Sequence, residues 1–186
     1  MAKAPEAPKF IGSPIKRRED PKLLRGLARY VDDIELPGTL HVAVVRSPFG
    51  RAGVRSVDID ALRDLPGVVA VYTAADLEGV GPVPVAGLVP DAKVPVQPVL
   101  ADKEVKFAGE PVAAIVSETR YGAADAAALV EVDFDPKEAV VDLEKALAPG
   151  APKVHEEYED NVAFNWELAG GDVEKGLDEA DIVVKQ

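Results

Sequence analysis

The chain has 186 residues, a formal net charge of -12 at pH 7 and no cysteine. This length suffices for one ordinary domain with its own core, and a content of 47% hydrophobic and 29% charged residues argues against disorder over the whole chain. The absence of cysteine excludes disulfides, thiolate metal ligands, iron–sulfur ligation and a cysteine nucleophile.

A basic arm opens an otherwise acidic protein. Residues 16–29 hold six of the 21 basic residues and only two acids, whereas residues 101–186 hold eight basic and 21 acidic side chains. Because the acidic half would repel a phosphate backbone and the arm has no interleaved aromatics, the sequence predicts no nucleic-acid binding. The apolar face of the arm is also too short for an interfacial helix, and no apolar run is long enough to span a membrane. We therefore expect a cytoplasmic protein with no membrane partner.

The next segments alternate between strand and helix patterns. Residues 39–47 are β-branched and apolar between turn signals, which is typical of a strand. Asp60 is placed to cap a short helix that ends at Pro66 and Gly67, and residues 68–73 form a second predicted strand. The order strand, short helix, strand predicts an α/β layer, in which helices alternate with the strands along the chain.

A long loop precedes the second group of elements. Residues 79–98 include eight glycines or prolines, so neither a helix nor a central strand can cross them. After it, residues 104–109 and 111–118 are predicted as two strands around a turn. Residues 119–130 form an alanine-rich helix, and residues 130–135 alternate as a strand does.

The final stretch differs in character. It contains a short capped helix ending at Gly150, a polar extended segment, and a helix capped by Asp172 that leads into a predicted strand over residues 182–185. We expect this part to be the start of a further domain.

The search for reactive groups finds no candidate site. His41 and His155 are far apart and share no metal-ligand spacing, and the acidic run of residues 156–160 lacks the glycine and the alternation of a calcium loop, which favours a solvated charge run. No serine lies in a nucleophile elbow, and no glycine-rich segment matches a dinucleotide or phosphate loop. The prediction is therefore no catalytic, no cofactor-binding and no metal-ligating residue in this chain.

Several separated blocks carry a family resemblance. The segments "IGSPIKRREDPKLLRGLARYVDDIELPGTLHVAVVRSP", "VDIDALRDLPGVVAVYTAADL", "VLADKEVKFAGEPVAAIVSETRYGAADAAALVEVDFDP" and "GAPKVHE" occur in this order. Together they resemble the N-terminal part of the large, molybdenum-binding subunit of the molybdenum hydroxylases. That family comprises xanthine dehydrogenases, aldehyde oxidases and aerobic carbon monoxide dehydrogenases, and the last of these are the most similar. One departure is the run Phe49-Gly50-Arg51-Ala52-Gly53, where the family often has an Ala-His-Ala type sequence.

The resemblance implies an α+β fold of the α/β-hammerhead type, with a mixed sheet and short helices. It implies a basic arm over residues 1–25, a hammerhead domain over residues 26–142, and the linker and first helix and strand of a molybdopterin-binding domain over residues 143–186. Molybdopterin would belong to the complete subunit, with iron–sulfur clusters and FAD on partner subunits, because the family motifs that hold the pterin and the glutamate base lie beyond the segments matched here. The basic arm would then run over the remaining domains or a neighbouring subunit, or it would be a solvated start of the domain.

Two functions are compatible with the sequence. The chain can be the N-terminal fragment of a molybdenum-cofactor oxidoreductase subunit, with a structural and docking role and no catalytic residue of its own. Alternatively, it can be a separately encoded, non-catalytic module that binds a protein partner. Neither reading identifies the substrate.

Overall fold

The chain divides into two units, residues 1–39 and residues 40–186, which are described separately below. The structure is a computed structural model that describes residues 10–85 and 89–185.

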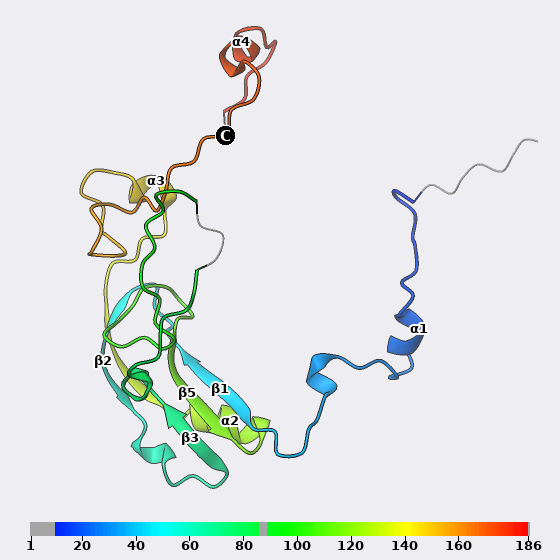
Figure 1. The fold of residues 1–186 in the computed structure, drawn as a ribbon, viewed down its shortest axis with the longest axis vertical. Coiled ribbons are helices and arrows are strands. Elements are labelled where there is room, and N and C mark those ends of the chain that lie inside the picture. The colour runs from blue at the N-terminus through cyan, green and yellow to red at the C-terminus, as the bar shows by residue number, and fades with distance from the viewer. Residues whose placement is uncertain (1–9, 86–88, 186) are drawn as a thin grey trace, which may run out of the picture. The chain divides into compact units, whose positions relative to one another are not determined.

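The first unit is an arm that contains two single turns of helix (Figure 1). α1 spans Asp20–Leu23 and the 3-10 turn η1 spans Val31–Asp33, and neither element buries a residue. Pro21 supplies the fixed backbone angle that favours the start of α1. The Asp33 carboxylate accepts a hydrogen bond from the Tyr30 amide at 2.8 Å and so closes η1. Local contacts of this kind stabilise the two helical turns of the first unit.

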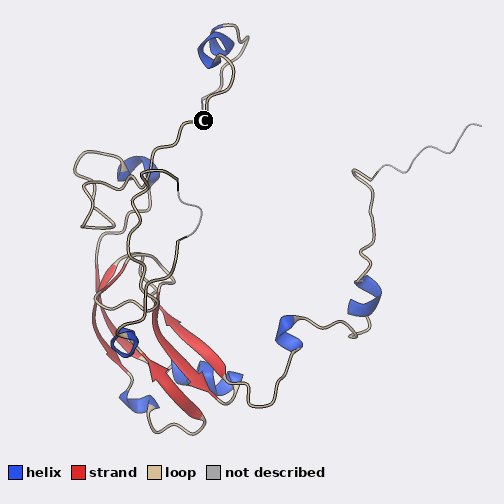
Figure 2. Ribbon diagram, in the orientation of Figure 1, coloured by secondary structure: helices blue, strands red, loops and turns tan. Residues whose placement is uncertain are grey.

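The second unit is built on two three-stranded antiparallel sheets (Figure 2). The first sheet has the order β1-β5-β3 and the second has the order β4-β2-β6. Every recorded pairing joins strands that are not consecutive in the sequence. The strands are β1 (His41–Arg46), β2 (Ala52–Asp58), β3 (Val68–Tyr72), β4 (Glu104–Val105), β5 (Pro111–Ser117) and β6 (Glu131–Pro136).

Short helical elements connect and cover these strands. The helix α2 (Arg120–Ala127) packs closely against the first sheet, because its buried side chains are small alanines. The Thr119 hydroxyl caps α2 by accepting a hydrogen bond from the Gly122 amide at 3.0 Å. The remaining elements are η2 (Asp60–Leu62), η3 (Ala74–Leu77), α3 (Leu143–Ala146) and α4 (Val173–Asp178).

Two hydrophobic clusters form the core. One lies between the first sheet and α2 and has Leu62, Ile115 and Ala126 at its centre. The other joins the start of β5 to the second sheet and contains four buried residues: Ala52, Ala101, Val105 and Val112. Strand β5 therefore contributes to both clusters and connects the two sheets.

Most predicted elements are confirmed, as is the α+β class. The strands predicted over residues 39–47, 68–73, 111–118 and 130–135 correspond to β1, β3, β5 and β6, and the predicted helix over 119–130 corresponds to α2. The strand predicted over 104–109 is confirmed only for its first two residues. Strand β2 was not predicted.

The strand predicted over residues 182–185 is wrong. These residues follow α4 but belong to no strand, and Ile182, Val183 and Val184 are all exposed. An apolar β-branched run forms a strand only where another backbone pairs with it. Among the described residues no strand pairs with this run.

Candidate functional site: a charged cluster beside the second sheet

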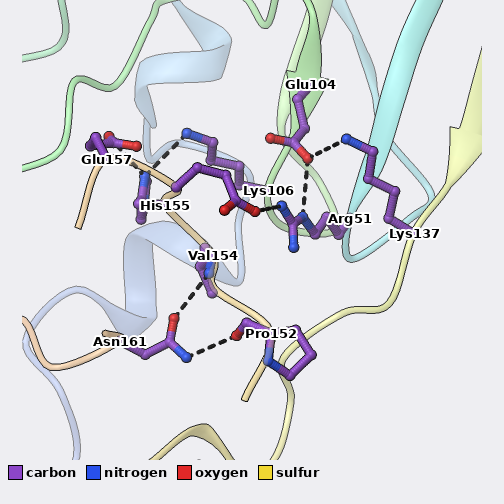
Figure 3. Close-up of polar contacts among 10 residues, drawn as sticks. Arg51, Glu104, Lys106, Lys137, Pro152, Val154, His155, Glu157 and Asn161 are labelled. Carbon is purple, nitrogen blue, oxygen red and sulfur yellow. Dashed lines mark hydrogen bonds and ion pairs between the residues drawn. The ribbon is translucent and has the colours of Figure 1, made fainter. Parts of the chain in front are cut away.

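Arg51 is the centre of a cluster of ion pairs at one end of the second sheet (Figure 3). Its Nε donates to Glu104 Oε1 at 3.0 Å, and its Nη2 donates to Glu156 Oε1 at 2.9 Å. Lys137 Nζ also donates to Glu104 Oε1, at 2.9 Å. We call Arg51, Glu104, Lys106, Lys137, His155 and Glu156 the charged cluster.

The register of the second sheet places three of these side chains together. Ala52 pairs with Val105 on one side and with Pro136 on the other. Arg51 and Lys137 are therefore level with each other, and Glu104, which pairs with Gly53, lies at the same end of the sheet. A hydrogen bond of 3.0 Å from the Lys137 amide to the Arg51 carbonyl extends the ladder to this point.

The arginine and the glutamate stabilise each other's charged forms. Burial would lower the pKa of the Arg51 guanidinium, but its hydrogen bonds to Glu156 and Glu104 outweigh this effect and raise the pKa. Burial would likewise raise the pKa of the Glu104 carboxyl, but hydrogen bonds from Lys137 and Arg51 lower it overall. Both groups are therefore charged at neutral pH.

A histidine and a lysine form the second half of the cluster. Lys106 Nζ lies 3.1 Å from His155 Nδ1, and Glu157 Oε1 lies 3.6 Å from the same ring nitrogen. Desolvation is the largest cause that lowers the pKa of His155, and the neighbouring Lys106 charge lowers it further against the opposing effect of nearby glutamates. The neutral imidazole can accept a hydrogen bond from the Lys106 ammonium at Nδ1, which fits this arrangement.

A single asparagine organises the segment that carries His155 and Glu156. The Asn161 side chain accepts from the Val154 amide at 2.9 Å and donates to the carbonyls of Pro152 at 2.9 Å and Ala146 at 3.1 Å. These bonds close residues 146–161 into a compact loop. The segment 150–163, which we call the tethered segment, thus has a defined shape where it meets the charged cluster.

The tethered segment also contacts the long loop. Lys93 pairs with Asp160 at 2.5 Å, and the Lys93 amide donates to the Ala163 carbonyl at 2.8 Å. A cavity of about 270 Å³ lies between these parts, with Pro95, Tyr158 and Val162 in its wall. The charged cluster thus holds residues 150–163 against the second sheet, and the Lys93 pair holds them against the long loop.

The structure also places the residues considered from the sequence. His41 lies in β1, far along the chain from the cluster that holds His155. The acidic run of residues 156–160 is not simply solvated, because Glu156 and Asp160 pair with Arg51 and Lys93. The buried hydroxyls of Ser47 and Ser117 donate to main-chain carbonyls, those of Phe49 and Gly67.

In the part of the chain that the structure describes, no group of three or more His, Asp or Glu side chains is arranged to hold a metal ion. No described helix is long and apolar enough to cross a membrane. Sequence reasoning did not find Arg51, Glu104, Lys106 or Asn161, because a single sequence carries no signal for pairs 53 or 105 residues apart.

The comparisons with known proteins agree with this architecture. The family described as "Aldehyde oxidase and xanthine dehydrogenase, a/b hammerhead domain" matches residues 25–138. This chain belongs to that family. Its hammerhead domain accounts for the α+β fold and for the two small sheets described above.

Curated and solved relatives come from molybdenum enzymes and related hydroxylases. The carbon monoxide dehydrogenase large chain of Afipia carboxidovorans is 40% identical over 85% of this chain and 20% of its own length. The nicotine 6-hydroxylase large subunit of Paenarthrobacter nicotinovorans is 35% identical over 94% of this chain and 21% of its own length. The crystal structure of quinoline 2-oxidoreductase from Pseudomonas putida 86 has a TM-score of 0.71 and 37% identity, over 82% of this chain and 20% of that one.

A structure of the Cu,Mo-CO dehydrogenase has a TM-score of 0.65 and 42% identity, over 82% of this chain and 19% of that chain. The chain spans about a fifth of the length of the relatives it matches. It therefore corresponds to the hammerhead part of molybdenum hydroxylase large subunits.

Proposed function

We propose that this hammerhead chain is a structural and docking part of a molybdenum-cofactor oxidoreductase. The observation that carries the proposal is the family match over residues 25–138, together with 40% identity to a carbon monoxide dehydrogenase large chain. In the proposed division, residues 1–25 are a contact arm, residues 26–142 are the hammerhead domain, and residues 143–186 lead into a molybdopterin-binding domain. The whole acts in the cytoplasm.

The proposed chemistry takes place outside this chain. We place molybdenum outside the described residues, among which no group of three or more metal-ligating side chains occurs. No step at the metal is therefore assigned to them. Molybdopterin would be bound by the remainder of the large subunit, and iron–sulfur clusters and FAD would be carried by partner subunits.

The charged cluster has a defined task in this proposal. It fixes residues 155 and 156 of the segment that follows the hammerhead domain, because Arg51 binds Glu156 and Lys106 binds His155. The Asn161 bonds fix the internal shape of the tethered segment, and the contacts of Glu156 and His155 hold that segment against the end of the second sheet. A rigid junction of this kind orients whatever follows it.

The test is co-expression with the rest of the large subunit from the same genome. We expect the chain alone to contain no stoichiometric molybdenum by elemental analysis, and the co-purified complex to contain about one molybdenum per large subunit. Stoichiometric molybdenum in the chain alone, or no association with the rest of the subunit, would contradict the proposal.

A further inference from the structure

The first sheet has one covered face and one open face. Its covered face carries Ile115, which is fully buried beneath α2. Because directly paired residues of antiparallel strands share a face, the opposite face is formed by two rows across the three strands. These rows are Val42, Val116 and Ala70, followed by Val44, Ala114 and Tyr72.

This open face is apolar throughout. Val42 is 61% exposed, Tyr72 is 41% exposed and Val44 is 36% exposed. None of the six side chains in the two rows is charged. Antiparallel sheets that meet water on one face normally place polar residues there.

The second sheet of the same molecule shows that normal pattern. Its inner face carries Val132 and Phe134, whereas the residues between and beyond them, Asp133 and Asp135, are exposed. Arg55 pairs with both aspartates on that outer face, at 3.8 and 2.9 Å. The outer face of the second sheet is therefore polar, whereas the open face of the first sheet is not.

We propose that the open face of the first sheet, defined by the two rows above, binds the remaining part of the large subunit. This inference rests on the proposed function. The relatives are about five times longer than the part that matches, so a large additional chain accompanies this fold in each of them. Contiguous exposed apolar area on one face is characteristic of an interaction surface.

The chemistry of the face restricts its occupant. We expect the surface that covers the two rows to be mainly aliphatic or aromatic, since none of the six side chains in them is charged. Arg46 is exposed at the end of β1, where its guanidinium donates to the Gly109 carbonyl at 2.8 Å and keeps further donors available. A carboxylate or carbonyl group of the occupant would lie opposite Arg46.

The experiment uses the full chain and the rest of the large subunit from the same genome. Val42→Lys and Val44→Lys place a charge on the open face, and Ser56→Lys places the same charge on an exposed position of β2 beside Asp133. All three sites are exposed, so the variants should fold, and thermal unfolding of each free chain checks this. We expect the first two substitutions to weaken binding at least tenfold and Ser56→Lys to change it less than twofold.

A second readout needs no substitution. Hydroxyl-radical oxidation of Tyr72 should fall at least threefold when the complex forms, because the occupant covers its ring. If the wild-type chain binds but neither lysine on the open face weakens binding and Tyr72 stays equally reactive, this inference is wrong and the proposed function stands. If the wild-type chain does not bind the rest of the subunit, both are wrong.

Discussion

Arg51 and Arg55 are two arginines close together in the sequence with opposite surroundings. The Arg51 side chain is 10% exposed and bridges Glu104 to Glu156, whereas Arg55 is 60% exposed and faces two solvated aspartates. Because solvent screens exposed ion pairs, such pairs add little to stability. Removing a shielded arginine costs more, because the carboxylates that it bound lose their hydrogen-bond donor. The two positions therefore form a matched pair for substitution.

We predict that Arg51→Met lowers the free energy of unfolding by about 1–2 kcal/mol. The loss stays moderate because Glu156 is largely exposed and Glu104 keeps its bond to Lys137. Arg55→Met should cost roughly 0–1 kcal/mol. Urea unfolding of the two variants measures the difference, and equal losses would show that the charged cluster contributes no more than a surface pair.

His155 gives the tethered segment a dependence on pH. Its pKa is lowered by desolvation and then by Lys106, while Glu157, Glu110 and Glu104 act in the opposite direction. The folded state therefore favours the neutral ring. The stability that the neutral His155 ring contributes is fully present above the pKa of an ordinary histidine, about 6.5. It is lost as the pH falls from there through the lower pKa that His155 has in the folded state.

We predict that the wild-type chain loses more stability between pH 7.5 and pH 5.5 than the variant His155→Gln. The carboxylates titrate in both proteins, so the difference between their pH profiles isolates the histidine. Thermal midpoints measured across this range provide the test. Parallel profiles for the two proteins would mean that protonation of His155 is not linked to folding.

Helix α2 comes so close to Ser117 of the first sheet at Gly122 that no side chain fits there. A Cβ atom on Gly122 would lie 2.7 Å from Ser117 Oγ and 2.9 Å from Thr119 Oγ1. The Ser117 hydroxyl is buried and already donates to the Gly67 carbonyl at 2.8 Å, so it has little freedom to move. The usual gain of helix propensity from alanine is opposed here by a steric clash.

We predict that Gly122→Ala lowers the free energy of unfolding by about 1–3 kcal/mol. The control is Gly176→Ala in α4, where nothing lies within 4 Å of the added Cβ. Since α4 buries no residue, that change should leave global unfolding unaltered and raise helix content only slightly. Chemical denaturation and circular dichroism separate the two effects, and a stabilised Gly122→Ala variant would refute the clash.

The elements differ in how readily their sequences predict them. β5 is recognisable because it is an apolar run bounded by turns, and four of its seven residues are buried. β2 is not recognisable, since Gly53, Arg55 and Ser56 interrupt its apolar residues and a register shift between Val54 and Ser56 breaks the alternation. Residues 182–185 show the reverse case: their sequence favours a strand, but they form none because no described strand pairs with them.

The charged cluster was beyond prediction from one sequence for a related reason. Arg51, Glu104 and Glu156 are brought together by the register of the second sheet and by the loop that Asn161 closes. Neither the pairing of β2 nor the fold of that loop is encoded in a local pattern. The family resemblance, by contrast, depends on several sequence blocks and is confirmed by the match over residues 25–138.

At the scale of the whole molecule, the topology makes folding depend on late segments. We predict that a chain ending at residue 128 resists proteolysis far less than one ending at residue 150, because only the longer chain contains β6 to complete the second sheet. Limited proteolysis of the two truncated chains at equal concentration tests this. Equal resistance would mean that the first sheet and α2 are stable without the second sheet.

The order of strands also has a consequence for protein synthesis. None of the recorded pairings joins successive strands, so β1 must wait for β5, which begins about 70 residues later in the chain. At a synthesis rate of about 5–20 residues per second, this wait lasts roughly 4–14 s. During that time the segment HVAVVR leaves the ribosome with both edges unpaired, in the state in which strands most readily join a neighbouring nascent chain. We therefore expect the spacing of nascent chains along one messenger RNA to influence how many molecules reach the folded state.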